Sequence, residues 1–242
     1  MQPGAPEVLA KIRASRRPLV LFTNGSDAPP ETFAAGLRAA GLAVADDELL
    51  TPLRSVQTYL RAHRRDGSVL LLGTDAAREY LVRAGVRILD GDATSADAVF
   101  VAHPNAADFA ELERAARAVL GGARLLTGSY VPAYAGADGP IFSRGAMLTA
   151  ALAKATGARP VVVGKPSRAA VQTTSEHFGT PSEELVVIGD DLRLDIALGR
   201  LGGSRTILVR TGISSSVELD HVAESRRPDA VVEAVADMLD WL

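Results

Sequence analysis

Cysteine is absent from the 242-residue chain, which excludes disulfide bridges, thiolate zinc sites and cysteine nucleophiles. A basic excess is absent as well: the formal net charge of −3 at pH 7 predicts no positive face that would attract nucleic-acid phosphates or anionic lipid. The printed sequence also lacks an apolar run of membrane-spanning length and a secretory signal pattern. We therefore expect a cytoplasmic protein with neither a nucleic-acid nor a membrane partner.

Lysine is scarce, since the chain holds 23 arginines but only three lysines, Lys11, Lys154 and Lys165. A lysine that persists against such a bias is a candidate for a role that needs a compact ammonium group. Apolar residues, in contrast, make up 47% of the chain. That content and this length suit one large domain or two small ones with a substantial core.

Short apolar runs alternate with stretches of helical period, which is typical of an α/β fold built from βαβ units around a mostly parallel sheet. The expected strands are 18–24, 68–74, 97–103, 123–129, 159–165, 184–190, 205–211 and 229–235. The expected helices are 31–40, 53–63, 75–84, 107–120, 144–156, 168–178 and 193–200. Polar segments near 47–52 and 157–160 predict the crossings between a discontinuous core and an inserted middle domain.

Open parallel sheets bind ligands at the carboxyl ends of their strands, and three predicted strand ends carry suitable polar side chains. The first is LFTNGS, in which Thr23 ends a strand and Asn24 and Gly25 begin a turn. The N–H groups of such a turn could point at an anion. An ordinary Asn-Gly turn is the alternative for this stretch.

The second strand end is VVVGKPS, where Lys165 directly follows an apolar run and Pro166 stops the ladder. The spacing and the proline rule out a P-loop. A surface lysine at the start of a loop is the alternative.

The third strand end is LVVIGDDLRLDI, in which Asp190 and Asp191 terminate a strand and Asp195 lies one helical turn later. Carboxylates this close repel one another and lose solvation, so they favour a divalent cation or a lysine. Helix capping by Asp190 or Asp191 is the alternative. Together the strand ends predict a phosphate and Mg²⁺ site, with Thr23 and Lys165 on the phosphoryl oxygens and Asp190 on the metal.

The order Thr23, Lys165, Asp190 resembles motifs two, three and four of the haloacid dehalogenase superfamily of phosphatases, and most closely its NagD-like or nitrophenylphosphatase branch. The resemblance covers nearly the whole chain and rests on PGAPEVL (3–9), PLVLFTNGS (18–26), GVRIL (85–89), VVVGKPS (161–167), VVIGDDLRLDIALG (186–199) and TILVRTGISS (206–215). It implies a Mg²⁺-dependent phosphatase that hydrolyses a small phosphorylated metabolite.

The same resemblance implies roles for individual residues. Lys165 and Asp190 would be catalytic, and Asp190 would bind the metal. Asp195 would orient metal-bound water or Lys165 from outside the ligand shell, and Asp191 is a less favoured metal ligand. The phosphate would be held by Thr23, Asn24, Gly25 and Lys165.

The resemblance further implies a Rossmann-like parallel-sheet core made of residues 1–48 and 160–242. An α/β cap of residues 49–159 would be inserted between them, and in that family the cap closes over the substrate and excludes water. Relatives form cap-mediated dimers, so a homodimer is an option for this chain. They usually carry Asn-Pro-Asp where this chain has LLTGSYVPAY (125–134), which leaves the role of that segment open.

One family feature is missing from the printed sequence. Family members begin with a strand carrying D-x-D, whose first aspartate attacks phosphorus and whose second protonates the leaving group. Upstream of Thr23 this sequence has no aspartate. Asp27 is the nearest spare carboxylate, but nothing in the sequence places it in line with a phosphate.

The missing strand would lie at the centre of the core sheet, between the strands that end at Thr23 and Asp190. There it would contribute on the order of 10 kcal/mol through buried apolar side chains, comparable with the whole net stability of a domain. We therefore expect that Met1 is not the natural first residue. We also expect no ladder between residues 19–23 and 185–189, and no phosphatase turnover by the printed chain.

Two other interpretations compete with the phosphatase. A non-catalytic protein that binds a phosphometabolite or a partner is one, and an upstream strand ending in D-x-D would decide against it. A signalling receiver domain also uses acids, a threonine and Lys-Pro around Mg²⁺. It places the acids first and is about half as long, so this interpretation is disfavoured.

Overall fold

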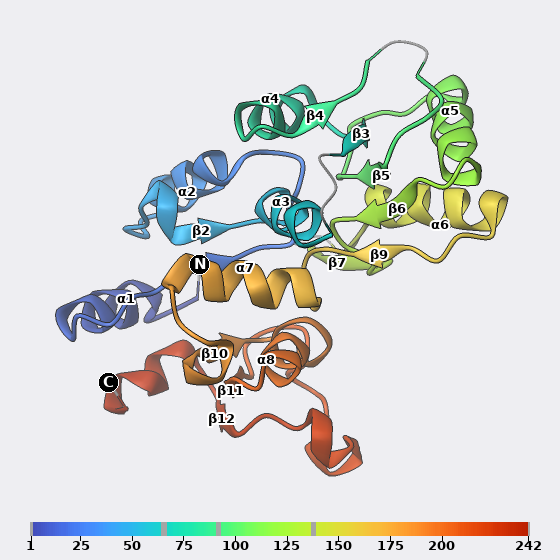
Figure 1. Ribbon diagram of the computed structural model, residues 1–242. Helices are drawn as coiled ribbons and strands as arrows, with labels where there is room; N and C mark the ends of the chain where they lie inside the picture. The colour runs from blue at the N-terminus through green and yellow to red at the C-terminus, as the bar shows by residue number, and fades with distance from the viewer. Residues whose placement is uncertain (1, 64–66, 91–92, 137–138, 242) are drawn as a thin grey trace. The chain divides into compact units, whose positions relative to one another are not determined.

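The computed structural model describes residues 2–63, 67–90, 93–136 and 139–241 (Figure 1). The chain forms two compact units. Unit 1 consists of the residues up to Phe22, Pro30–Leu50 and the residues from Lys165 onward, and unit 2 consists of Thr23–Pro29 and Thr51–Gly164. The expected division into a core of 1–48 and 160–242 and a cap of 49–159 stays a prediction.

Unit 1 contains two parallel sheets. The larger has the order β10-β11-β12, in which Ile188 is in register with Ile207, and Ile207 with Ala230. The other pairs β1 with β2. The five strands are β1 (Leu21–Phe22), β2 (Leu49–Leu50), β10 (Val186–Gly189), β11 (Arg205–Val209) and β12 (Ala230–Val232).

The expectation that the strands ending near Thr23 and Asp190 are not ladder partners is confirmed for the described residues. β1 pairs with β2, and β10 pairs with β11. We predicted that a further strand belongs between β1 and β10, and this stays a prediction.

The helices of unit 1 are α1 (Ala5–Ala14), α2 (Pro30–Ala39), α7 (Arg168–Phe178) and α8 (Ala197–Gly202). A π-helical turn, η3 (Leu192–Ile196), precedes α8, and the 3-10 segments are η1 (Asp46–Glu48), η2 (Ser182–Glu184), η4 (Leu219–His221), η5 (Glu224–Arg226) and η6 (Val235–Asp240). α7 has the expected bounds because Ser167 accepts a hydrogen bond from the Ala170 N–H at its start and Gly179 takes φ 63° at its end. A buried cluster of Val8, Val209, Val232 and Met238 joins α1 and η6 to the β11–β12 sheet.

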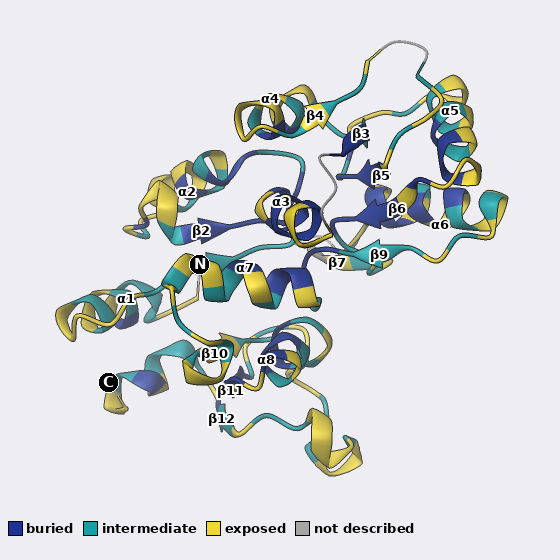
Figure 2. Ribbon diagram, viewed as in Figure 1, coloured by how far each residue is buried: buried dark blue, intermediate teal, exposed yellow. Residues whose placement is uncertain are grey.

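Unit 2 is built on a five-stranded parallel sheet with the order β4-β3-β5-β6-β9. Its strands are β3 (Ser68–Leu72), β4 (Arg87–Ile88), β5 (Ala98–Val101), β6 (Arg124–Thr127) and β9 (Val161–Val162). The central strands are apolar and buried, as Figure 2 shows for β3, β5 and β6. This is the pattern expected of a parallel sheet with elements on both faces.

The helices of unit 2 are α3 (Pro52–Ala62), α4 (Asp75–Arg83), α5 (Phe109–Leu120) and α6 (Arg144–Thr156). Three of them begin at side-chain caps, in which Thr74, Asp108 and Ser143 accept hydrogen bonds from the backbone three residues on. The core between the sheet and α5 and α6 contains Leu70, Leu72, Val99, Val101, Val119, Leu125 and Leu152. An antiparallel hairpin of β7 (Ala133–Gly136) and β8 (Gly139–Phe142) precedes α6.

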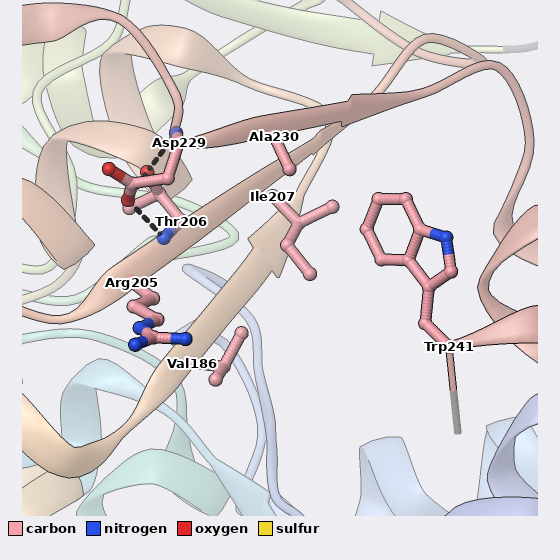
Figure 3. A pocket seen from close by; sticks show the side chains of 7 residues that line it. All are labelled: Val186, Arg205, Thr206, Ile207, Asp229, Ala230 and Trp241. Atoms are coloured by element: carbon pink, nitrogen blue, oxygen red, sulfur yellow. Dashed lines mark hydrogen bonds between the residues drawn. The ribbon is translucent and has the colours of Figure 1, made fainter.

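β10 is unusual because its apolar side chains are open to solvent. Val186 is 52% exposed and Ile188 is 39% exposed. Val186 also lines a hollow of about 410 Å³ in which Trp241 faces Ile207 and Ala230 (Figure 3). Within the described residues β10 has one ladder partner, β11, so it is an edge strand with an apolar surface.

No helix among the described residues has both the length and the hydropathy needed to cross a membrane.

Candidate functional site

Asp191 is the helix cap that the sequence offered as an alternative. Its Oδ1 accepts hydrogen bonds from the backbone N–H groups of Arg193 at 2.7 Å and Leu194 at 3.2 Å. The residue is buried at the start of η3. Because its carboxylate satisfies the first amides of the turn, Asp191 is poorly suited to bind a metal.

Asp190 is held by the loop that follows β11. Its Oδ2 accepts a hydrogen bond from the Ile213 N–H at 3.1 Å, and its carbonyl oxygen accepts one from the Ser214 N–H at 3.1 Å. A Cβ on Gly212 would lie 1.7 Å from Asp190 Oδ2, so glycine alone fits there. The TGISS stretch of the resemblance therefore has a local structural function, which is to position the Asp190 carboxylate.

Lys165 and Asp195 form a largely buried ion pair. The Lys165 Nζ donates to Asp195 Oδ1 at 2.6 Å, and the two side chains are 14% and 11% exposed. The other carboxylate oxygen of Asp195 accepts from the Asp191 N–H at 3.2 Å. The backbone of β10 approaches closely, since a Cβ on Gly189 would lie 2.3 Å from the Asp195 carboxyl group.

These contacts bring Lys165, Asp195 and Asp191 together at the carboxyl end of β10. Lys165 directly precedes the loop to α7, and the aromatic ring of Phe22, at the end of β1, lies 5.7 Å from the Lys165 Nζ. The Asp195 carboxylate offsets the cost of burying the Lys165 ammonium, because an unpaired buried ammonium is costly. The surface-lysine alternative for Lys165 is therefore wrong.

The turn that begins at Thr23 lies in unit 2. The Gly25 N–H donates to the Thr23 Oγ1 at 3.1 Å, so this amide would have to leave an internal bond before it could bind an anion. Asn24 lies beside Gly164, where a Cβ would come within 2.6 Å of Asn24 Oδ1. Gly164 directly precedes Lys165. That the turn, Lys165 and Asp190 converge on one ligand stays a prediction.

The described residues contain no group of three or more His, Cys, Asp or Glu side chains arranged to hold a metal ion. Mg²⁺ prefers carboxylate oxygens and keeps several waters. Asp190 fits as one such ligand, whereas Asp195 is neutralised by Lys165 and Asp191 caps η3. The residues present thus fit part of a Mg²⁺ site, and a second carboxylate would be needed to complete it.

His103, which follows β5 in unit 2, is a titratable residue that the sequence gave no reason to select. Burial, together with the positive charge of Arg144, holds the pKa of His103 below its usual value, and Asp27 opposes this shift. Asp27 is itself fixed, since its carbonyl oxygen accepts a hydrogen bond from Thr74 Oγ1 at 2.5 Å. The signal that could have found His103 is its position at the end of an apolar strand.

Comparison with known proteins gives consistent results. A family model described as haloacid dehalogenase-like hydrolase matches residues 1–87, and one described as HAD-hydrolase-like matches residues 162–238. Ribonucleotide monophosphatase NagD of Escherichia coli K12 is 31% identical over 237 residues, 98% of this chain and 90% of that protein. Dihydroxyacetone phosphatase of Corynebacterium glutamicum is 27% identical over 99% of this chain and 85% of that protein. The structure of a p-nitrophenyl phosphatase from Archaeoglobus fulgidus matches with a TM-score of 0.87 and 28% identity, covering 99% of this chain and 92% of that one.

Proposed function

Because the chain belongs to the haloacid dehalogenase-like hydrolases, in their NagD-like branch, we propose that it is built to hydrolyse the phosphate ester of a small metabolite with the help of Mg²⁺. The observation that carries the proposal is the buried Lys165–Asp195 ion pair beside Asp190. A lysine fixed in this way presents a positive charge without the freedom of a surface side chain, as phosphoryl transfer requires.

Each residue has a proposed role. Lys165 neutralises the phosphoryl oxygens, and Asp195 orients Lys165. Asp190 provides a carboxylate ligand for Mg²⁺, which when bound would polarise the phosphoryl group and offset its charge. The turn of Thr23, Asn24 and Gly25 holds the remaining phosphoryl oxygens through a hydroxyl and backbone N–H groups.

The covalent step needs a nucleophile that these residues do not provide. Residues 1–22 contain no aspartate, and the carboxylates of Asp191 and Asp195 are already engaged. We place the nucleophile and the proton donor on a strand encoded upstream of Met1, which would lie alongside β10 and cover its exposed Val186 and Ile188. It would also supply the second metal carboxylate.

A non-catalytic phosphometabolite-binding protein is the second candidate. It is favoured by the same absence of an aspartate before Thr23. In this alternative Lys165, Asp190 and Thr23 still bind a phosphate group, but without turnover.

We also propose a substrate class, a cellular location and an assembly for this chain. The relatives' names refer to a ribonucleotide monophosphatase and a dihydroxyacetone phosphatase, so a small phosphorylated metabolite is the shared class. We place this chain in the cytoplasm, with 49–159 as a cap that excludes water from the substrate, and a homodimer as its assembly.

The test is hydrolysis of p-nitrophenyl phosphate with Mg²⁺ by three proteins. These are the printed chain, a chain extended at its amino terminus by the upstream-encoded D-x-D strand, and the extended chain with its first motif aspartate changed to asparagine. We expect turnover by the extended chain alone, because positioning without an in-line carboxylate leaves at most slow attack by metal-bound water. Robust turnover by the printed chain that Asp190→Asn abolishes would contradict the upstream nucleophile, and Asp27 would be the first residue to test in its place.

A further inference from the structure

The same tripeptide, Gly-Ala-Arg, occurs at two corresponding places in unit 2. It joins α5 to β6 as Gly122-Ala123-Arg124, and α6 to β9 as Gly157-Ala158-Arg159. Both glycines have positive φ, 106° and 72°, and so end the preceding segment in a conformation that favours glycine. Each helix thus delivers an arginine to the amino end of the strand that follows.

The sheet register brings these two arginines side by side. β6 and β9 are parallel neighbours with Leu126 opposite Val161, so the positions two residues earlier, Arg124 and Arg159, correspond. Pro160 lacks an N–H and therefore cannot extend the ladder, but it favours an extended backbone at Arg159. Adjacent strands lie about 4.8 Å apart, and matched residues of parallel strands point to the same face.

Neither guanidinium has a carboxylate partner within the described residues. Both arginines are exposed, and they share the lining of a hollow of about 380 Å³ with Val119, Gly122, Ala123, Leu125 and Ala158. The nearest acid along the neighbouring strand, Asp97, directs its carboxylate to the backbone and hydroxyl of Ser68, at 2.9 and 3.0 Å.

Two like charges at corresponding positions beside the ends of adjacent strands repel each other. An anion between them would remove this repulsion, and the planar guanidinium suits a phosphate or carboxylate through paired hydrogen bonds. A phosphate group carries a charge of about −1.5 to −2 at pH 7, which two arginines would match. We propose that Arg124 and Arg159 form a binding site for a phosphate group at the amino edge of the unit 2 sheet.

The test follows the side-chain Nε–Hε resonances of arginine by NMR in the full printed chain, without Mg²⁺ and at constant low ionic strength. Inorganic phosphate and methylphosphonate are the probes, the second standing for a phosphate group on an organic molecule. Because the readout is specific to each arginine, phosphate bound near Lys165 does not enter it. We expect the Arg124 and Arg159 resonances to shift along one saturable curve. Tighter binding of methylphosphonate would identify an organic phosphate as the natural ligand, and tighter binding of inorganic phosphate the free ion.

The variants Arg124→Gln and Arg159→Gln assign the resonances and test cooperation. Either change should raise the dissociation constant measured at the remaining arginine about tenfold, because one of two charge-assisted contacts is removed. Arg87→Gln is the matched control, since Arg87 is an exposed arginine that begins β4 at the opposite edge of the same sheet. Linear, unsaturable shifts like those of Arg87, or an unchanged dissociation constant in either variant, would overturn the proposal.

Discussion

At the scale of single residues, Lys165 and Asp195 form an ion pair whose side chains are only 14% and 11% exposed. Asp195→Asn should lower the free energy of unfolding by about 3 kcal/mol, because it leaves the Lys165 ammonium without its carboxylate partner. Urea denaturation measures the change. The double variant Lys165→Met/Asp195→Leu should recover much of the loss, since it removes both charges. A loss below about 0.5 kcal/mol in Asp195→Asn would mean that the pair is solvated and does not fix Lys165.

Gly212 offers a second residue-scale test, because a Cβ there would overlap the Asp190 carboxylate. Gly212→Ala should cost about 1 to 3 kcal/mol and displace Asp190, the typical penalty for overpacking a tight site. In the extended chain it should reduce p-nitrophenyl phosphate turnover as strongly as Asp190→Ala does.

Gly36→Ala is the matched control for that variant. Gly36 lies within α2 and a Cβ there meets nothing within 4 Å, so alanine should stabilise the helix by about 0.5 to 1 kcal/mol. Equal effects of the two substitutions on turnover would show that the space around Gly212 does not control Asp190.

At the scale of elements, a salt bridge fixes α1 to η1 in unit 1. Glu48 accepts hydrogen bonds from the Arg13 guanidinium at 2.5 Å and from the Ala45 N–H at 2.8 Å. Burial raises the pKa of Glu48, but the Ala45 and Arg13 contacts outweigh it and hold that pKa below its usual value. A carboxyl group whose pKa is lower in the folded state stabilises the fold above its unfolded pKa, and this contribution is lost as the pH falls through its folded pKa.

We therefore expect Glu48→Gln to lower the free energy of unfolding at pH 7 by up to about 1 kcal/mol, with the difference from the parent chain shrinking towards about pH 3. Thermal denaturation across this range measures it. Glu113→Gln serves as the control, because Glu113 pairs with Arg117 on the surface of α5, where both side chains are mostly exposed. A difference for Glu48→Gln that stays constant with pH would contradict the role assigned to its charge.

At the scale of the whole molecule, the printed chain and the extended chain proposed above should differ in the exposure of the apolar side of β10. In the printed chain Val186→Thr should change the free energy of unfolding by less than about 0.5 kcal/mol, because half of Val186 already faces water. In the extended chain, where a strand would cover it, the same substitution should cost more than about 1 kcal/mol.

Parallel urea denaturation of the two backgrounds makes this comparison. The control is Val99→Thr, which lies on fully buried β5 in unit 2 and should cost the same in both. Equal effects of Val186→Thr in the two backgrounds would place the added strand away from β10.

The sequence by itself determined the secondary structure wherever apolar periodicity and caps agree. All eight expected strands are present, although shorter than expected, and the expected helix 193–200 is divided into the π-helical turn η3 and the short helix α8. The helices α6 and α7 have their expected bounds because Ser143, Gly157, Ser167 and Gly179 are local signals. It did not predict α1, a short helix that packs its apolar residues on η6 and β12. Nor did it predict β2 and β4, which are two residues long and exist through pairing with distant strands.

Tertiary structure alone decided which of the polar residues meet. The three aspartates after β10 look alike in sequence but have different contacts. Asp191 caps η3, Asp195 pairs with Lys165, and Asp190 is held by the loop around Gly212. The sheet register likewise sets the two Gly-Ala-Arg segments beside each other. The physical reason is that a helix cap depends on residues three or four positions away. The Lys165–Asp195 ion pair joins residues 30 positions apart, and the register of β6 with β9 pairs residues 35 positions apart, so both depend on how the intervening elements pack.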